Sequence, residues 1–164
     1  GEALFDYAKA HPEMDCLGIE VHRPGAGHLL MNVGENALTN VRTSCHDAVE
    51  VLTHQLAPSS IDAVHIFFPD PWHKARHHKR RLIQPAFADL LARIIKPSGM
   101  LRLATDWQNY AEHMRAVLDV HPAFTNLADD SGYMPRPDDR PLTRFERRGH
   151  RLGHGVWDMA YQRC

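Results

Sequence analysis

The stretch IDAVHIFFPDPWHKARHHKRR, residues 61–81, decides the fold that the sequence predicts. Its first part, residues 61–68, is rich in β-branched and aromatic residues, which is typical of a strand buried on both faces. Such a strand indicates a parallel sheet covered by helices. Directly after it, Asp70 stands as a lone acid between Pro69 and Pro71, and a run of bases follows. The stretch therefore predicts a buried strand that ends in a chemically distinctive loop.

Helical and strand patterns alternate along the rest of the chain. Apolar residues at helical spacing predict helices over residues 2–10, 28–35, 48–56, 85–95 and 107–118. Short apolar runs predict strands over residues 15–21, 40–45, 61–68, 100–105 and 156–163. Residues 96–99, KPSG, are expected to end the fourth helix, and residues 128–142 are expected to form a loop. This alternation predicts an α/β fold with a mostly parallel sheet and helices on both faces.

An acid lies at or just after the end of four predicted strands. These acids are Glu20, Asp47, Asp70 and Asp106. In open α/β sheets, ligands bind beyond the carboxyl ends of the strands. We therefore expect the four carboxylates to converge on one rim of the sheet and to mark a binding site there.

Composition narrows the class of protein. The 164 residues fit one domain, and 43% apolar and 24% charged residues are typical of a globular protein. The formal net charge of −1 excludes a global attraction to polyanions, so affinity for nucleic acid would have to come from a local patch. We see no bilayer-spanning stretch and no signal-peptide pattern, so we expect no membrane partner. Three scattered cysteines favour a reducing cytoplasm.

The bases after Asp70 have two interpretations. Five cations stand within eight residues, namely Lys74, Arg76, Lys79, Arg80 and Arg81. Most charge runs are solvated loops or helix starts, but cations in this density also form phosphate clamps. The neighbouring strand-end acid favours the clamp. Histidines among the bases, His73, His77 and His78, raise the question of zinc, which we disfavour because no tight His/Cys/Asp grouping accompanies them.

The two prolines stiffen the loop around the acid. Pro71 pushes Asp70 out of the α region, and Pro69 fixes its own φ. Asp70 is therefore expected on a stiff, extended turn at the strand end. Trp72 has two equally weighted interpretations, because it would either stack on an extruded base or plug the edge of the sheet as part of the core.

The other singled-out acids have structural interpretations as well. Asp47 and Asp106 precede apolar-periodic runs, where Asp is a favoured N-cap. Thr143 and Glu146 fit the spacing of a capping box. Glu20 is unremarkable by position alone. Structural and functional roles are compatible, because a helix N-terminus also donates backbone N–H groups to ligands.

At this point the sequence resembles the bacterial tRNA (guanine-N7)-methyltransferases, which have the class I, S-adenosylmethionine-dependent fold. The resemblance is carried by FPDPWHKARHHKRRL (68–82), ATDWQNYAEHM (104–114), RPLTRFERRGHRLGH (140–154) and the final VWDMAYQR. GIEVHRPGAGHLL (18–30) and NVRTSCHDAVEVL (40–52) match the cofactor half. The resemblance covers essentially the whole chain, and it implies a Rossmann-like sheet with an antiparallel C-terminal strand.

The resemblance implies a role for each matching residue. Glu20 would hold the cofactor ribose, Asp47 would face its adenine, and Asp70 would be the catalytic acid and also border the cofactor. The substrate-binding positions are Lys74, Asp106, Thr143, Arg144, Phe145 and Glu146. The RNA-contact segment is Arg76, His77, His78, Lys79, Arg80 and Arg81, with Arg147, Arg148 and Arg151 extending that surface.

One feature of the family is absent from the sequence as it stands. The family has a strand that ends in a G-x-G-x-G loop before the first helix, whereas this sequence opens GEALFDY, with Gly1 at the place of the last glycine. We expect a single class I methyltransferase domain over residues 1–164, shortened at its N-terminus relative to the family and without that first strand and loop.

The sequence therefore predicts an enzyme that transfers a methyl group from S-adenosylmethionine to N7 of a guanine in the tRNA variable loop. Two alternatives stay open. One is a non-catalytic RNA-binding module derived from the fold. The other is a Rossmann-like methyltransferase for a small substrate, which would not need the basic run. We expect tRNA as a partner, no metal, a cytoplasmic location, and either a monomer or a homodimer.

Overall fold

The computed structural model describes residues 1–140, 142, 144–151 and 155–164. The chain divides into two compact units, one formed by Gly1–Gln55 with Asp138–Thr143 and the other by Leu56–Pro137 with Arg144–Cys164. The single domain predicted over residues 1–164 stays a prediction.

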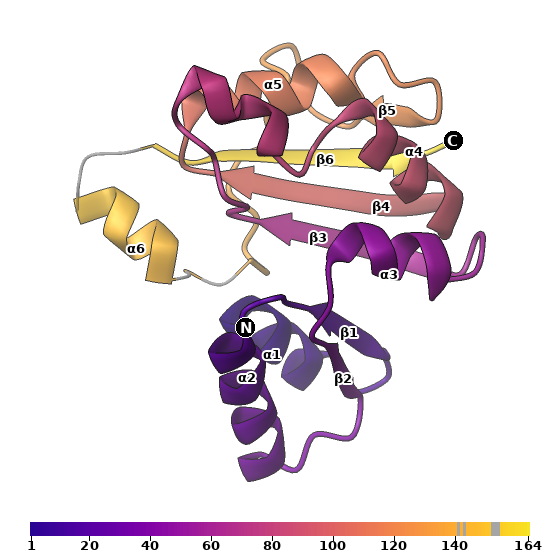
Figure 1. Ribbon diagram of the computed structural model, residues 1–164, viewed down its shortest axis with the longest axis vertical. Helices are drawn as coiled ribbons and strands as arrows, with labels where there is room; N and C mark the ends of the chain where they lie inside the picture. The colour runs from indigo at the N-terminus through magenta and orange to yellow at the C-terminus, as the bar shows by residue number, and fades with distance from the viewer. Residues whose placement is uncertain (141, 143, 152–154) are drawn as a thin grey trace. The chain divides into compact units, whose positions relative to one another are not determined.

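The first unit builds a parallel strand pair against two helices (Figure 1). Strands β1 and β2 run in register, with Cys16 opposite Val41. Helices α1 and α2 pack against each other and against these strands. The elements of the unit are α1 (Glu2–Ala10), β1 (Cys16–Ile19), α2 (Arg23–Glu35), β2 (Val41–Ser44) and α3 (Ala48–His54).

Helix α2 begins five residues earlier than predicted, at Arg23 instead of His28. The sequence RPGAG was interpreted as a loop because of its glycines, but Pro24 occupies the first turn, where a missing backbone N–H costs nothing. Ala26 and Leu29 are buried on one side of this helix. Packing of that apolar side outweighs the low helix propensity of the glycines.

One buried amide joins the end of α1 to the start of β2. Asn40 is 6% exposed, and its Nδ2 lies 3.0 Å from the carbonyl oxygen of Ala8, 3.1 Å from that of His11 and 2.9 Å from that of Met14. The carbonyl of Ala8 has no donor within α1, because the residue four positions on is Pro12, whereas that of His11 already accepts from the N–H of Met14 at 3.0 Å. The Asn40 amide therefore satisfies the end of α1 and ties it to the start of β2.

The second unit holds a four-stranded sheet in the order β3-β4-β6-β5 (Figure 1). Strands β3 and β4 are parallel, whereas β6 is antiparallel to both β4 and β5. The predicted antiparallel C-terminal strand is thus confirmed. The elements are β3 (Ile61–Phe67), the 3₁₀ helix η1 (Ala75–Arg80), α4 (Pro85–Ile94), β4 (Ile95–Thr105), α5 (Gln108–Leu118), β5 (Phe124–Asn126), α6 (Arg144–Arg151) and β6 (Trp157–Arg163).

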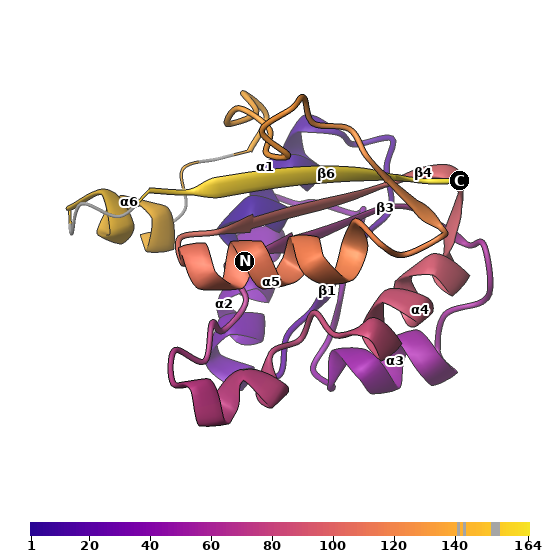
Figure 2. The ribbon, with the colours of Figure 1, turned by 90° about the horizontal axis from the view of Figure 1, so that it is seen from above.

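Helices α4 and α5 cover one face of this sheet, as their apolar stripes predict (Figure 2). Leu91 of α4 and Met114 of α5 are fully buried, and so are Leu101 of β4 and Tyr161 of β6. Burying each such side chain stabilises the fold by about 1.5–3 kcal/mol. The second unit therefore has a core of its own.

The segment KPSG was wrongly predicted to separate a helix from a strand. Strand β4 starts directly at Ile95, and residues 96–99 belong to it as an irregularity opposite Ile61–Ala63. Ser98 adopts a positive φ of 67°. A Cβ at Gly99 would lie 2.8 Å from the backbone oxygen of Asp62, so only glycine fits this close approach of the two strands.

Three short elements were not predicted as such. Strand β5 has only three residues, and η1 lies inside the basic run. Helix α6 has almost no apolar residues, so its sequence carries no periodic signal. Both views draw α6 beyond the end of the sheet at which β3 and β4 finish (Figures 1 and 2). These elements depend on neighbours rather than on local patterns.

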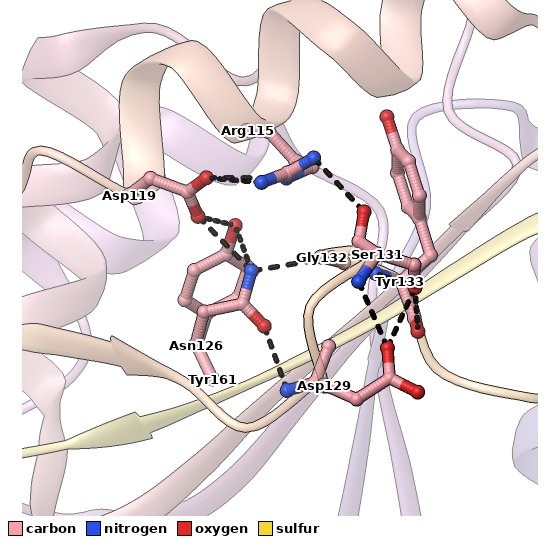
Figure 3. A network of polar contacts seen from close by, with 9 residues as sticks. Arg115, Asp119, Asn126, Asp129, Ser131, Gly132, Tyr133 and Tyr161 are labelled. Atoms are coloured by element: carbon pink, nitrogen blue, oxygen red, sulfur yellow. Dashed lines mark hydrogen bonds and ion pairs between the residues drawn. The ribbon is translucent and has the colours of Figure 1, made fainter.

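A polar network fixes the loop that follows β5 (Figure 3). The guanidinium of Arg115 pairs with Asp119 at 3.0 Å and donates to the carbonyl oxygen of Ser131 at 3.3 Å. The buried hydroxyl of Tyr161 donates to Asp119 at 2.6 Å. Burial and this bond raise the pKa of Tyr161, so the hydroxyl keeps its proton. The network ties the loop to α5 and β6.

Gly132 is the residue on which this network depends most directly. Its φ is +79°, and a Cβ there would overlap the guanidinium of Arg115. We expect Gly132→Ala to lower the free energy of unfolding by about 1–3 kcal/mol, because alanine disfavours this φ and displaces Arg115. Urea denaturation measures the change.

A matched control is Gly34→Ala, since a Cβ at Gly34 of α2 meets no atom within 4 Å. There alanine should stabilise the helix by up to about 1 kcal/mol. Equal effects of the two substitutions would show that the Arg115 network does not hold the loop.

Candidate active site

Two of the predicted acids follow adjacent parallel strands of the second unit. Phe67 of β3 is opposite Ala104 of β4, and the N–H of Phe68 donates to the carbonyl oxygen of Ala104 at 2.8 Å. Asp70 and Asp106 therefore leave the sheet at the same edge. The expectation that strand-end acids gather holds for this pair.

The turn that carries Asp70 is bounded by two residues of unusual backbone geometry. Phe68 has a φ of +55° and Trp72 a φ of +44°. Bulky side chains rarely adopt positive φ, and each such residue costs of order 1–3 kcal/mol. The prolines explain the stiffness predicted for this turn, but these two reversals could not be predicted, because neither residue type favours them. Strain of this kind is characteristic of functional turns.

The carboxylate of Asp70 is exposed at the top of this turn. Its Oδ1 accepts a hydrogen bond from the backbone N–H of Trp72 at 3.2 Å, which closes a small ring within the loop. The side chain is thus oriented by its own turn and presented to solvent. An acid held in this way is available to a ligand.

Aromatic side chains line the two loops. The ring of His73 lies 4.1 Å from that of Trp107, which joins the loop after β3 to the loop after β4. Trp72 is half-buried, with Arg80 5.1 Å above its ring and His77 at 5.9 Å from it, edge on. Stacking of Trp72 on an extruded base stays a prediction.

The predicted role of Asp106 as an N-cap is wrong. The N-cap of α5 is Trp107, whose backbone N–H bonds to the hydroxyl oxygen of Thr105 at 3.2 Å, and no side chain caps the helix. Asp106 is half-buried one residue before the cap. This shift removes the capping interpretation, and the predicted substrate contact of Asp106 stays a prediction.

Most of the basic run faces solvent. Its exposed members are Lys74, Arg76, Lys79 and Arg80. His77 and His78 are half-buried, and a ring nitrogen of His78 lies 3.3 Å from the carbonyl oxygen of His73. Exposed cations are accessible to phosphates, and the RNA contact of this segment stays a prediction.

Arg81 differs from the rest of the run because it is only 3% exposed. Its Nε donates to the carbonyl oxygen of Pro71 at 2.7 Å, and its Nη2 donates to Oδ1 of Asn109 at 2.7 Å. Burial lowers the pKa of Arg81, and Tyr110 beneath it raises that pKa in part. The placement of Arg81 gives no support to the RNA contact predicted for it.

Helix α6 carries the last group of predicted substrate residues. Arg144 is exposed, and Phe145 lies in the helix. Glu146 is buried, with its Oε1 accepting from Nε of Arg136 at 3.1 Å. Thr143 lies outside the described residues, so the capping box is untested. The sequence did not predict the pair of Arg136 with Glu146, because one residue lies in a loop and the other in a helix ten positions later, and such a pair leaves no periodic pattern.

In the first unit, Glu20 and Asp47 follow the adjacent parallel strands β1 and β2. The side chain of Asp47 accepts from the backbone N–H groups of Val49 at 2.9 Å and Glu50 at 3.3 Å, so its predicted N-cap is confirmed. Glu20 is exposed, and its Oε1 accepts from the N–H of His22 at 2.9 Å.

An open hollow of about 480 Å³ lies between the start of α2 and the end of β2. It is lined by the start of α2, including Arg23 and Gly27, and by residues at and after the end of β2, including Thr43 and His46. The sequence missed it, because the start of α2 was interpreted as a loop. Neither Glu20 nor Asp47 is among the residues that line the hollow, so their cofactor contacts stay predictions.

Two kinds of site find no support in the described residues. Among residues 1–140, 142, 144–151 and 155–164, no group of three His, Cys, Asp or Glu side chains is arranged to hold a metal ion. Within the same ranges, no helix has the length and apolar character needed to cross a bilayer.

Comparison with known proteins identifies relatives of the chain. A family model described as "Putative methyltransferase" matches residues 1–159. Proteins named tRNA (guanine-N(7)-)-methyltransferase are similar over 99% of this chain. The protein from Photobacterium profundum is 57% identical, and the chain covers 66% of its length. The protein from Vibrio cholerae (strain O395) is 56% identical, with 69% of its length covered, and the protein from Burkholderia vietnamiensis is 60% identical, with 63% of its length covered. The chain thus spans about two thirds of the length of these curated relatives.

Solved structures give the fold independently. A SAM-dependent O-methyltransferase from Thermotoga maritima matches with a TM-score of 0.55 and 16% identity, over 91% of this chain and 49% of that one. A methyltransferase homologue from Pyrococcus horikoshii matches with a TM-score of 0.62 and 11% identity, over 92% and 53%. The fold is that of a class I methyltransferase. Within that class, the chain belongs to the tRNA (guanine-N7)-methyltransferase family.

The predicted family, fold class and enzyme class are therefore confirmed. The roles of individual residues stay predictions. The structure brings Asp70, Asp106 and the exposed bases to one edge of the second unit, and it places Glu20 and Asp47 at the strand ends of the first.

The capping role of Asp47 is separable from its predicted contact with adenine. We expect Asp47→Ala to lower the free energy of unfolding by about 1 kcal/mol, because two N–H groups of α3 lose their acceptor. Asp47→Asn keeps an acceptor oxygen and should leave the free energy of unfolding within a few tenths of a kcal/mol of the wild-type value. Chemical denaturation of both variants measures this, and equal losses would contradict the capping role.

Proposed function

We propose that this chain transfers a methyl group from S-adenosylmethionine to N7 of a guanine in the tRNA variable loop. Membership of the family supports the reaction, and one observation about the site carries its mechanism. Asp70 is an exposed carboxylate on a strained turn, held by the N–H of Trp72 at 3.2 Å and followed by a run of exposed cations.

The chemistry requires positioning more than proton transfer. Guanine N7 has a lone pair and no hydrogen at neutral pH, so it attacks without prior deprotonation. When bound, S-adenosylmethionine supplies an electrophilic methyl group on a sulfonium. The task of the protein is to hold the purine in line and to provide a field suited to a cationic product.

Asp70 meets that requirement. Methylation places positive charge on the purine, and a carboxylate beside it stabilises that charge more in the transition state than in the ground state. The same oxygens accept hydrogen bonds from N1–H and N2–H of guanine, a donor pattern that adenine lacks. One residue would thus contribute to both rate and base selection.

The first unit would bind the nucleoside part of the cofactor. The carboxylate of Glu20 accepts from the ribose hydroxyls, since only its Oε1 is engaged within the described part of the chain, by the N–H of His22. Asp47 caps α3 through Oδ1 and would face the adenine. Both assignments come from the family resemblance and fit the positions of these side chains.

The second unit would bind the RNA. Four exposed cations of the basic run follow the acid-bearing turn, and each phosphate contact would contribute about −0.7 to −0.9 to the slope of log affinity against log salt. Lys74, Asp106 and the α6 residues Arg144, Phe145 and Glu146 would contact the substrate beside the reacting base, together with Thr143. A tRNA substrate and three free cysteines make the cytoplasm the compartment that we propose.

The reaction is tested by incubating the protein with labelled S-adenosylmethionine and bulk tRNA, followed by nucleoside analysis. We expect the label in 7-methylguanosine. Titration calorimetry with the cofactor accompanies the assay. Binding of tRNA with neither cofactor binding nor methyl transfer would instead indicate an RNA-binding module, and label in a small molecule would indicate a small-substrate enzyme.

Asp70 is tested by Asp70→Asn, which keeps the size of the side chain and removes its charge. We expect a loss of turnover of about 100-fold or more, with a much smaller loss of tRNA affinity, because the charge acts on the transition state. Single-turnover rates and filter binding measure the two quantities.

The control is Asp62→Asn at the opposite end of β3. Asp62 pairs with Lys96 at 3.0 Å on the surface, where such pairs contribute little. Its removal should leave turnover unchanged. Near-full activity of Asp70→Asn would refute the role given to Asp70.

A further inference from the structure

We propose that Arg81 is a positioning residue for the catalytic turn and not part of the RNA grip. This inference rests on the proposed function, because it assigns Arg81 the task of holding Asp70 in place. A phosphate contact and a positioning role make different demands on the side chain of Arg81. A phosphate contact needs an exposed guanidinium, whereas Arg81 is 3% exposed and donates from Nε and Nη2 to protein acceptors.

The first contact of Arg81 reaches the residue directly after Asp70. Its Nε donates to the carbonyl oxygen of Pro71 at 2.7 Å. The next residue, Trp72, has the strained φ of +44° and bonds back to Asp70. A strained turn persists only where its surroundings hold it, and this charged hydrogen bond is one of the contacts that do so.

The second contact reaches the other loop of the site. Nη2 of Arg81 donates to Oδ1 of Asn109 at 2.7 Å, in the first turn of α5 and three residues after Asp106. The guanidinium also lies 4.8 Å above the ring of Tyr110, which is fully buried. Arg81 therefore links the loop after β3 to the loop after β4.

The charges of Asp70 and Arg81 both act on the hydroxyl of Tyr110. Burial is the main cause that raises the pKa of Tyr110, the charge of Arg81 lowers it in part, and the charge of Asp70 raises it further. Asp70, Arg81 and Tyr110 thus lie within electrostatic reach of one another. A planar, forked guanidinium suits this bridge, since one group donates to two acceptors at fixed angles, which an ammonium does not.

The neighbouring residue provides a natural contrast. Arg80 has the same side chain one position earlier, but it is exposed and lies over the face of Trp72. The two arginines therefore separate the roles of surface cation and buried link. Any effect of charge alone should appear at both positions.

The first experiment compares Arg81→Lys with Arg80→Lys, which keep the net charge. We expect Arg81→Lys to lower the single-turnover rate at saturating tRNA and cofactor by about 10- to 100-fold, because small misplacement of a reacting group has effects of that size. The tRNA dissociation constant should change less than about threefold. Thermal unfolding is recorded in parallel, and an unchanged rate for Arg81→Lys would overturn the proposal.

The second experiment measures tRNA affinity against salt for Arg81→Gln and Arg80→Gln. We expect Arg80→Gln to reduce the slope by about 0.7 to 0.9, the value for one phosphate contact, and Arg81→Gln to leave it unchanged. An equal reduction for both variants would return Arg81 to the RNA-contact segment and overturn the proposal.

Asn109→Ala keeps the test open if the Arg81 variants do not fold, because Asn109 is exposed and its loss leaves the core intact. We expect a smaller fall in turnover with an unchanged salt slope, and no fall would overturn the bridge. Failure of the proposed function is distinguishable. A wild-type protein that binds tRNA without methylating it would refute that function, while the salt slopes would still show whether Arg81 contacts RNA.

Discussion

The parallel pairing of β3 with β4 is the constraint on which the second unit depends. Because Phe67 is opposite Ala104, both strands end at one edge, and the residues that follow them are brought together. Asp70 and Asp106 are 36 positions apart in sequence, yet their loops touch through the rings of His73 and Trp107 at 4.1 Å. The same pairing brings Asn109 within reach of Arg81. The acids, the aromatic rings and the link between the loops all follow from one strand register.

Rigidity at this edge has a cost that the rest of the unit offsets. Positive φ values at Phe68 and Trp72 are unfavourable, and a buried guanidinium is costly unless its donors are paired. Here the two costs meet in one contact, since Arg81 donates to the carbonyl oxygen of Pro71, between Asp70 and the strained Trp72. The buried residues of α4, α5 and β4 supply the stability that permits it. In the role proposed for Asp70, a carboxylate fixed before the substrate arrives would need no reorganisation during methyl transfer.

The basic run contains two kinds of cation that look identical in sequence. Lys74, Arg76, Lys79 and Arg80 are exposed and suit a polyanion, while Arg81 is enclosed. A protein with a net charge of −1 attracts RNA only through such a local patch. The patch begins directly after the acid-bearing turn. The same short segment would therefore supply both the grip on the substrate and the carboxylate that acts on it.

The sequence by itself determined the α/β class, the strand that ends before Asp70, the stripes of α4 and α5, and the family, because periodicity and the FPDPW motif are local features. It also located the N-cap at Asp47. It misjudged the start of α2, the KPSG segment and the cap of α5, and it did not predict α6, since packing or irregular pairing overrides weak local signals there. Only the tertiary structure decided that Arg81 is buried, that Glu146 pairs with Arg136, and that Phe68 and Trp72 adopt positive φ. These features depend on which residues are neighbours in the folded chain. Burial and backbone strain are set by those neighbours and not by residue type.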